Sequence, residues 1–453
     1  MCHVIFQFEI NILQVYLLLP LILPGLYTVT MKFASPLTFL SLLVPSVLGY
    51  IADTVVIHDN SDIEDNDYNI DTITDIIISN GQSFISIEAN DNDLELNDIN
   101  GNLLYKNLVI LSNKAKSLGS NIDYKSLLSF AENGGNIIIT SDSINGTNLD
   151  NTLFLNEIGI YPSPKGYKYI DYHNNNGDSN VNINSNQFLN EYIISSSNED
   201  TGMEIKLKDP SVALISNSEF LIPLLQTSRS SFSKDKSSKK DISWHTGLEG
   251  YLAVAFQGRN NGRITWIGSK NILFEYPEIT NEIIQWTFQQ KSVIKVNEFI
   301  HKRVDNEGNE IIFVDEDDFY KQGDLTDVKF SMIELKNGEW VPFVANETLQ
   351  LEFIMLDPFQ RLKMENLKNG SHHINCKLPD QFGIFTFRID YRKPGLTYLR
   401  AEDIVTVRHL AEDEHGRSWE NSNSYVYLAG LGSVIASWLI FVILFLFTSE
   451  DTK

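Results

Sequence analysis

The segment Leu108–Ile139, LVILSNKAKSLGSNIDYKSLLSFAENGGNIII, decides the fold of the N-terminal half of the chain. Two apolar runs, Leu108–Leu111 and Ile137–Ile139, have the length and near-continuous hydrophobicity of strands that are covered on both faces. Between them, Tyr124–Glu132 has a helical pattern that ends at Asn133-Gly134-Gly135, and glycine terminates helices well. Strand, helix, glycine turn and strand form a βαβ unit, which predicts a parallel sheet.

Apolar runs of the same kind flank this unit. Thr54–Ile57 precedes it, and Leu252–Phe256 and Ile264–Gly268 follow it around the turn Gln257–Arg263. Tyr276–Gln290 has the pattern of a closing helix. These elements predict a doubly wound α/β domain. Two low-complexity inserts in it are predicted to be exposed loops, an Asn-rich one at His173–Asn186 and a Ser/Lys-rich one at Ser228–Lys240.

From about Ile294 the pattern of hydrophobicity changes to period two. Apolar and polar residues alternate along Val328–Met332 and again along Phe385–Tyr391. This alternation is typical of antiparallel strands that are buried on one face, and turns such as Lys336-Asn337-Gly338 separate the runs. Seven or so strands in about 120 residues predict a β-sandwich-like domain.

The C-terminal stretch Tyr425–Phe447 contains no charged residue. A helix rises about 1.5 Å per residue, so roughly 20 apolar residues cross the core of a bilayer. Tyr425 and Tyr427 lie at one end, where aromatic rings suit the level of the lipid headgroups. The stretch predicts a membrane-spanning helix, which leaves residues 448–453 as a short tail.

Small residues recur on one face of this span. Ala429, Ser433 and Ser437 are spaced by four, with Gly432 and Ala436 beside them. Small side chains let two membrane helices approach closely where lipid supplies no hydrophobic driving force. We therefore predict that these residues form a helix-packing face. The alternative is the ordinary enrichment of small residues in membrane helices.

The N-terminus has the pattern of a secretory signal. Met31-Lys32 precedes the apolar run Phe33–Leu48, and small residues at Val47 and Gly49 suit a signal peptidase. Residues 1–30 carry no Lys or Arg and are interpreted as an upstream extension of the gene model. We predict that translation starts at Met31 and that cleavage follows Gly49.

A cleaved signal and one late span define the predicted organisation of the chain. The signal region is 1–49, the α/β domain 50–293, the sandwich-like domain 294–424, the membrane helix 425–447 and the cytosolic tail 448–453. Both domains then lie in the lumen of the secretory pathway, where Cys376 is the only cysteine left and no internal disulfide forms. Candidate N-glycosylation sites in this region are Asn145, Asn346 and Asn369.

The sequence lacks the motifs of several kinds of site. A net charge of −24 argues against a nucleic-acid partner, because phosphate binding needs clustered Lys and Arg. There is no G-x-S-x-G, Walker A or G-x-G-x-x-G motif after a strand, and the lone mature cysteine falls in the sandwich. His372, His373 and Cys376 lack a second pair of zinc ligands. Pairs such as Asp65 and Asp67 are interpreted as surface residues. We therefore predict no catalytic residue, no cofactor and no metal site.

Leu351–Phe359, LEFIMLDPF, resembles the most distinctive segment of the wheat-germ-agglutinin-binding-protein subunits of oligosaccharyltransferase. The similarity covers essentially the whole mature chain. Further segments similar to that family, in the same order, are Asn133–Ile137, Gln257–Arg263, Trp286–Gln289, Trp340–Phe343, Lys377–Asp380, Phe382–Phe385 and Asp390–Gly395.

The resemblance implies a single-pass type I protein of the endoplasmic reticulum membrane, with its bulk in the lumen. Its complex transfers a preassembled glycan from dolichyl diphosphate to Asn of N-x-S/T in nascent chains. In that family the chemistry belongs to a multispanning subunit with a Trp-Trp-Asp motif, and this chain has no Trp-Trp pair. The family's α/β domain resembles a glutamine amidotransferase without its nucleophile. The implied partners are the Trp-Trp-Asp subunit, a ribophorin-II-like subunit and a small defender-against-death-like subunit.

Two other classes of function stay open at this point. The first is an independent lumenal hydrolase or transferase with an amidotransferase-like fold, which the missing nucleophile motifs oppose. The second is a surface receptor or adhesion protein, which the lack of disulfides and the short tail oppose. The leading hypothesis is a non-catalytic subunit that assembles the complex and positions its catalytic subunit.

Overall fold

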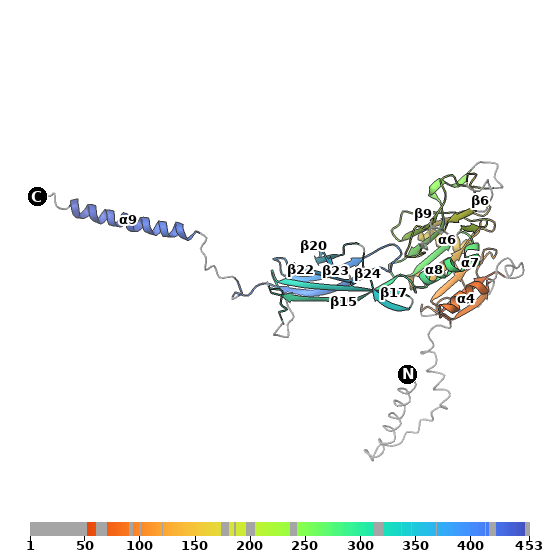
Figure 1. Ribbon diagram of the computed structural model, residues 1–453, viewed down its shortest axis with the longest axis horizontal. Helices are drawn as coiled ribbons and strands as arrows, with labels where there is room; N and C mark the ends of the chain where they lie inside the picture. The colour runs from red at the N-terminus through yellow and green to blue at the C-terminus, as the bar shows by residue number, and fades with distance from the viewer. Residues whose placement is uncertain are drawn as a thin grey trace, which may run out of the picture.

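The computed structural model contains two β-sheet-based domains and one C-terminal helix (Figure 1). It describes residues 52–59, 70–89, 94–98, 101–119, 121–173, 181–184, 187–195, 204–235, 242–305, 307–311, 320–336, 338–345, 347–367, 369–412, 414–415 and 423–448. The predicted signal region, with its start at Met31 and its cleavage after Gly49, lies outside the described residues. The same is true of Asn346, of Asp65 and Asp67, and of residues 449–453.

The N-terminal domain is built on a nine-stranded mixed sheet. Its order is β2 (Phe84–Glu88), β1 (Thr54–His58), β3 (Asn107–Ile110), β4 (Asn136–Thr140), β14 (Arg263–Ile267), β13 (Tyr251–Gln257), β9 (Ala213–Ile215) and β5 (Ile160–Pro162), with β10 (Leu221–Gln226) also on β13. The strands from β2 to β14 are parallel to their neighbours, and those beyond β14 are antiparallel. The prediction of a parallel sheet therefore holds for the first five strands of this order.

Helices cover both faces of this sheet. The helices α4 (Asp71–Ser79), α7 (Asn271–Glu275) and α8 (Pro277–Thr287) contribute to one hydrophobic core, and α5 (Tyr124–Glu132) and α6 (Leu149–Ile158) to the other. Successive side chains of a strand point to opposite faces, so Val109 joins the first core while Leu108 and Ile110 join the second. Because both faces of these strands are buried, their sequences are continuous apolar runs.

Helix α5 has the predicted bounds, because strong local signals mark both of its ends. Asp123 accepts a hydrogen bond from the Ser126 N–H at 2.8 Å, and Ser126 Oγ accepts one from the Asp123 N–H at 3.0 Å. This capping box starts the helix. After the helix ends, a Cβ at Gly135 would lie 2.3 Å from the Phe130 ring. Only glycine therefore fits at the position just before β4.

Two smaller sheets extend the domain and correct the prediction of two loops. One has the order β12 (Ser243–Thr246), β11 (Phe232–Asp235) and β6 (Tyr167–Ile170), and the other pairs β7 (Val181–Asn184) with β8 (Glu204–Leu207). Strand β11 falls in the predicted loop Ser228–Lys240, and β7 falls in the predicted loop His173–Asn186. Low complexity concealed both strands, because at least half of the residues in each strand are polar.

The second domain is a sandwich of two five-stranded sheets. One has the order β15 (Val293–Val304), β17 (Leu325–Lys336), β22 (Ser371–Lys377) and β21 (Glu365–Asn366), with β18 (Glu339–Pro342) on β17. The other has the order β16 (Tyr320–Lys321), β24 (Leu399–Arg408), β23 (Gly383–Tyr391), β19 (Gln350–Met355) and β20 (Asp357–Lys363). Phe330 and Met332 from the first sheet and Phe353, Phe385 and Phe387 from the second share one core. The structure has more strands in this domain than the seven or so that the sequence predicted. Short strands such as β16 and β21 were missed because they are too short to show a period in the sequence.

The two domains meet at Arg263, the first residue of β14. This side chain is fully buried, and its guanidinium donates to the carbonyl oxygens of Trp286 at 2.6 Å, Lys291 at 2.8 Å and Ser292 at 2.9 Å. It also lies 4.7 Å from the centre of the Trp286 ring. Arg263 thus donates to carbonyls at and after the C-terminal end of α8 that lack a partner within the helix, and a positive charge is favourable there.

The same guanidinium reaches the sandwich. Its second nitrogen donates to Thr397 Oγ1 at 3.1 Å, just before β24 begins. Burial lowers the pKa of Arg263 to about 9, which leaves the group charged at neutral pH. No carboxylate pairs with Arg263 among the described residues, so backbone dipoles and one ring take the place of a counter-ion.

Further hydrogen bonds surround this contact. Trp286 Nε1 donates to the Gly395 carbonyl at 2.8 Å, and Gln257 Nε2 donates to the Leu396 carbonyl at 2.9 Å. In the opposite direction, the Tyr398 N–H donates to Asn261 Oδ1 at 2.9 Å. The segment between β23 and β24 is therefore bound directly to the α/β domain.

The C-terminal helix α9 (Ser424–Thr448) follows the sandwich, which separates it from the α/β domain (Figure 1). It is the one described helix that is long and apolar enough to cross a membrane. At about 1.5 Å per residue its length is about 37 Å, more than the roughly 30 Å of a bilayer core. The prediction of one apolar C-terminal helix is confirmed.

We expect the substitution Arg263→Ala to lower the free energy of unfolding by about 3–5 kcal/mol, because buried carbonyl groups would lose their donor. Denaturant unfolding of the purified full chain in detergent measures this change. Arg361→Ala is the matched control: the Arg361 side chain is 58% exposed and pairs with Glu352 on the surface, so the expected loss is below about 1 kcal/mol. Equal effects of the two substitutions would contradict the role given to Arg263.

Candidate functional site

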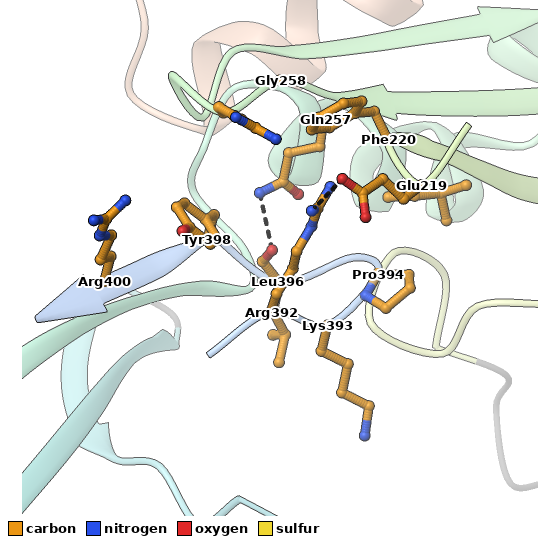
Figure 2. Close-up of a pocket in the computed structure, with 12 residues that line it drawn as sticks. Glu219, Phe220, Gln257, Gly258, Arg392, Lys393, Pro394, Leu396, Tyr398 and Arg400 are labelled. Carbon is orange, nitrogen blue, oxygen red and sulfur yellow. Dashed lines mark hydrogen bonds and ion pairs between the residues drawn. The ribbon is translucent and has the colours of Figure 1, made fainter. Parts of the chain in front are cut away.

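A pocket of about 420 Å³ opens between the two domains (Figure 2). The start of β10, the end of β13 and the segment between β23 and β24 form its walls. Residues from both domains line it, namely Glu219, Phe220, Gln257, Gly258 and Arg259 from the α/β domain and Arg392, Lys393, Pro394, Leu396, Tyr398 and Arg400 from the sandwich.

The lining of this pocket is basic, although the chain as a whole is acidic. Arg392 pairs with Glu219 at 2.7 Å across the pocket, and its guanidinium lies 4.6 Å from the centre of the Phe220 ring (Figure 2). Arg259 contacts the same ring from 5.6 Å. The Phe220 ring therefore makes cation–π contacts with two arginines, Arg259 from the α/β domain and Arg392 from the sandwich. This arrangement holds the domains together and leaves positive charge at the mouth of the pocket.

Sequence reasoning assigned no function to these residues. Six of them lie in two of the segments that carry the family resemblance, Gln257–Arg263 and Asp390–Gly395. The structure brings these two segments together, and the resemblance was the available signal for them. Their spacing alone matches no motif of catalysis or ligand binding.

The usual ligand position in a doubly wound sheet is the carboxyl edge of the parallel strands. There Asp59, which follows β1, accepts hydrogen bonds from Ser112 Oγ at 2.5 Å and from the Asn113 and Lys114 N–H groups at 2.9 Å. Burial alone would raise the pKa of Asp59, but these hydrogen bonds and the charge of Lys270 lower it overall. Asp59 is therefore a stable carboxylate that ties β1 to the loop after β3.

Two buried serine side chains of the described part of the domain, Ser141 and Ser231, lack the arrangement of a nucleophile. Ser141, which follows β4, is fully buried, and its Oγ accepts a hydrogen bond from Trp266 Nε1 at 2.6 Å. Ser231 Oγ lies 3.4 Å from His245 Nε2, but both residues are buried and His245 Nδ1 has no hydrogen-bond partner among the described residues. Burial lowers the pKa of His245 to about 4, so it is a poor general base near neutral pH.

Strand β22 separates the side chains that sequence reasoning considered for zinc. His372 and Cys376 point into the core, whereas His373 is on the other face and pairs with Asp327 at 2.5 Å. Burial raises the pKa of the Cys376 thiol, and Thr326 Oγ1 lies 2.9 Å from its sulfur. Within the described residues, no group of three or more His, Cys, Asp or Glu side chains is placed to hold a metal ion.

Two of the predicted glycosylation sites differ in accessibility. Asn369 is exposed in the turn between β21 and β22. Asn145 is half-buried, and its Nδ2 donates to Asp142 Oδ2 at 3.1 Å. The structure thus presents Asn369 to solvent and holds the acceptor nitrogen of Asn145 within its own turn.

The predicted packing residues of α9 are all exposed. Ser433 Oγ donates back to the Gly430 carbonyl at 2.7 Å, and Ser437 Oγ donates to the Ser433 carbonyl at 2.7 Å. Their hydroxyl groups are therefore satisfied within the helix. The face formed by Ala429, Gly432, Ser433, Ala436 and Ser437 is small and smooth, as close helix packing in a membrane needs.

Comparisons with known proteins cover most of the chain. Residues 50–290 match the family model described as "OST48, N-terminal domain", and residues 301–449 match the "OST48 middle domain". Among solved structures, the "mmIFT52 N-terminal domain" covers 52% of this chain and 96% of its own length at 11% identity, with a TM-score of 0.36. A ThuA-like protein from Bacteroides uniformis covers 52% of this chain and 90% of its own at 11% identity, with a TM-score of 0.28.

Characterised relatives are similar over the same region. The WBP1 subunit of dolichyl-diphosphooligosaccharide–protein glycosyltransferase from Saccharomyces cerevisiae is 37% identical over 363 residues, which are 77% of this chain and 81% of the relative. The 48 kDa subunit of that transferase from Danio rerio is 24% identical over 380 residues, 78% of this chain and 83% of the relative. The chain therefore belongs to the OST48/WBP1 family of subunits of the oligosaccharyltransferase complex of protein N-glycosylation.

Proposed function

We propose that this chain is a non-catalytic subunit that holds the catalytic subunit of the oligosaccharyltransferase complex in position during protein N-glycosylation. The observation that carries the proposal is the buried junction at Arg263, which joins the two β-sheet-based domains that precede the apolar helix α9. A buried contact of this kind suits a scaffold, because it holds surfaces on the two domains in a defined relation to each other.

The side chains described above support a non-catalytic role. The oxygen of Ser141 is buried under Trp266, and the only described serine–histidine contact lacks a third group to orient the imidazole. We infer that the α/β domain is an amidotransferase-like fold that lacks its nucleophile, since the one cysteine of the predicted mature chain lies in β22 of the sandwich. The competing proposal, an independent lumenal hydrolase or transferase, needs an activated nucleophile.

The proposed location is the membrane of the endoplasmic reticulum, with a type I orientation. Helix α9 would span the bilayer, with residues 50–424 in the lumen. The proposed partners are the Trp-Trp-Asp catalytic subunit, a ribophorin-II-like subunit and a defender-against-death-like subunit. The small-residue face of α9 is the proposed contact with their membrane helices.

A pull-down from microsomes in mild detergent tests the proposal. We expect the tagged full chain to recover a multispanning Trp-Trp-Asp subunit together with sequon-dependent glycan transfer. After the partners have been stripped away, the purified chain should transfer no glycan to a sequon peptide. Turnover by the stripped chain would refute the non-catalytic role, and recovery of the chain alone would refute the scaffold role.

Substitution of the small-residue face tests the membrane contact. We expect Gly432→Leu combined with Ala436→Leu to reduce recovery of partner subunits sharply, because the added side chains hold neighbouring helices apart. The apolar character of α9 stays the same, so insertion into the membrane should not change. The control combines Ile440→Leu with Ile443→Leu, which keeps side-chain volume. Equal recovery in both variants would exclude this face as a contact.

Accessibility leads to a prediction for the glycosylation sites. We expect Asn369 to carry a glycan, because its turn is exposed. Endoglycosidase treatment should then shift the mobility of the wild-type chain, and Asn369→Gln should remove one step of that shift. The comparison variant Asn145→Gln tests whether the half-buried turn is also modified before it folds. A full shift in the Asn369→Gln variant would contradict the prediction.

A further inference from the structure

An apolar patch lies at the end of the sandwich that is far from the α/β domain. Four large side chains are exposed there: Leu356 by 99%, Ile404 by 69%, Ile384 by 67% and Phe382 by 63%. Leu356 is at the turn between β19 and β20, Phe382 just precedes β23, and the two isoleucines are on β23 and β24. We call these four residues the end patch.

The strand register makes the end patch continuous. On the outer face of the sheet, Thr386 of β23 is paired with Ile354 of β19 on one side and with Ile404 of β24 on the other. Ile384 is two residues before Thr386 on the same face, so it is a diagonal neighbour of Ile404. At the turn, Met355 Sδ would lie 3.2 Å from a Cβ at Gly383. Leu356 therefore projects beside the start of β23.

Polar residues replace the apolar ones further along the same face. The next row across the three strands is Glu352, Arg388 and Glu402. Arg388 donates to Glu352 at 2.5 Å, and Arg361 donates to Glu352 at 2.8 Å. Apolar surface bordered by paired charges is typical of the centre and rim of a protein interface.

The backbone conformation of Leu356 also favours a protein interface at the end patch. Its φ is +74°, in the left-handed region that non-glycine residues rarely adopt. A leucine held there with its side chain 99% exposed gains nothing from packing within this chain. Both costs are compensated when the side chain enters a pocket of a partner, as buried anchor residues of interfaces do.

The end patch lies close to the membrane anchor along the chain. Strand β24 ends at Arg408, and the ring of His409 lies 5.9 Å from that of Phe382. The chain then continues to α9, which begins at Ser424 (Figure 1). An occupant of the end patch must therefore reach the lumenal region next to the bilayer.

The bilayer itself fits this end of the sandwich poorly. The other sheet carries ion pairs at the same end, namely Arg303 with Asp324 at 2.8 Å and Lys302 with Glu310 at 2.7 Å. Arg408 also pairs with Glu414 at 2.7 Å. Insertion end-on would bury these charges along with the apolar side chains, which is costly. Ile384 and Ile404 lie on the outer face of the sheet, so this apolar surface is open to the side of the sandwich.

We propose that the end patch is the docking surface for an apolar lumenal segment of another subunit of the complex, located next to the membrane. The proposal rests on the scaffold function proposed above. Leu356 is the anchor that enters a pocket of this segment, and Ile384, Ile404 and Phe382 surround it. The charged row at Glu352 and Arg388 forms the polar edge of the interface.

Photo-crosslinking from position 356 identifies the occupant. In the full chain in microsomes, Leu356→p-benzoylphenylalanine should form an adduct with one other subunit, within an apolar segment of it. The control position is Leu149 at the start of α6, which is 68% exposed and lies in the other domain, and it should not label that subunit. Adducts with lipid alone would show that the end patch contacts the bilayer. The absence of any adduct would show that the end patch faces solvent. Either outcome overturns the proposal.

Substitutions measure the contribution of the patch to assembly. We expect Leu356→Ser combined with Ile404→Thr to reduce recovery of the crosslinked subunit roughly tenfold or more in the mild-detergent pull-down. Leu149→Ser should leave recovery unchanged, and an unaltered unfolding temperature of the double variant shows that the sandwich still folds. If the wild-type chain recovers no subunit, the scaffold function fails. If the wild type and the double variant recover the complex equally, only the docking surface fails.

Discussion

The buried guanidinium of Arg263 is the constraint on which the arrangement of the two domains depends. It starts β14 in the centre of the sheet, caps the carbonyls after α8 and reaches Thr397 at the start of β24. A charge in this position is tolerated because fixed backbone dipoles solvate it in place of water. The helix end, the sheet and the sandwich therefore share one buried, hydrogen-bonded side chain.

Sequence patterns predicted the elements whose signals are local. Helix α5 has its capping box and its glycine stop, and the parallel strands have continuous apolar runs, so both were predictable. Strand β11 was not, because three of its four residues are polar and its pairing with β6 brings together segments more than sixty residues apart. The additional strands of the sandwich were missed for a similar reason. Their hydrogen bonds are set by tertiary neighbours and their short length leaves no period to detect.

Some features of the candidate site could also be predicted from the sequence, and others could not. The absence of nucleophile and nucleotide motifs was visible in the sequence, as was the small-residue face of the terminal helix. The junction pocket was not, because it is formed by residues more than a hundred positions apart, such as Phe220 and Arg392. Leu356 attracted attention only through the resemblance of its segment to the family. Its backbone conformation and its exposure, which suggest a role in contact, required coordinates.

On the non-catalytic role proposed above, the doubly wound domain has a physical use in an assembly. Its helices bury both faces of the sheet, and its polar carboxyl edge is closed by hydrogen bonds such as those of Asp59. The long strands of the sandwich run from the Arg263 junction to the end near α9 (Figure 1). On the scaffold function proposed above, partners bound at the two ends and on α9 would be held apart by this length. Such a subunit would contribute to transfer by positioning other subunits, since misplacement of reacting groups by even about 1 Å slows a reaction strongly.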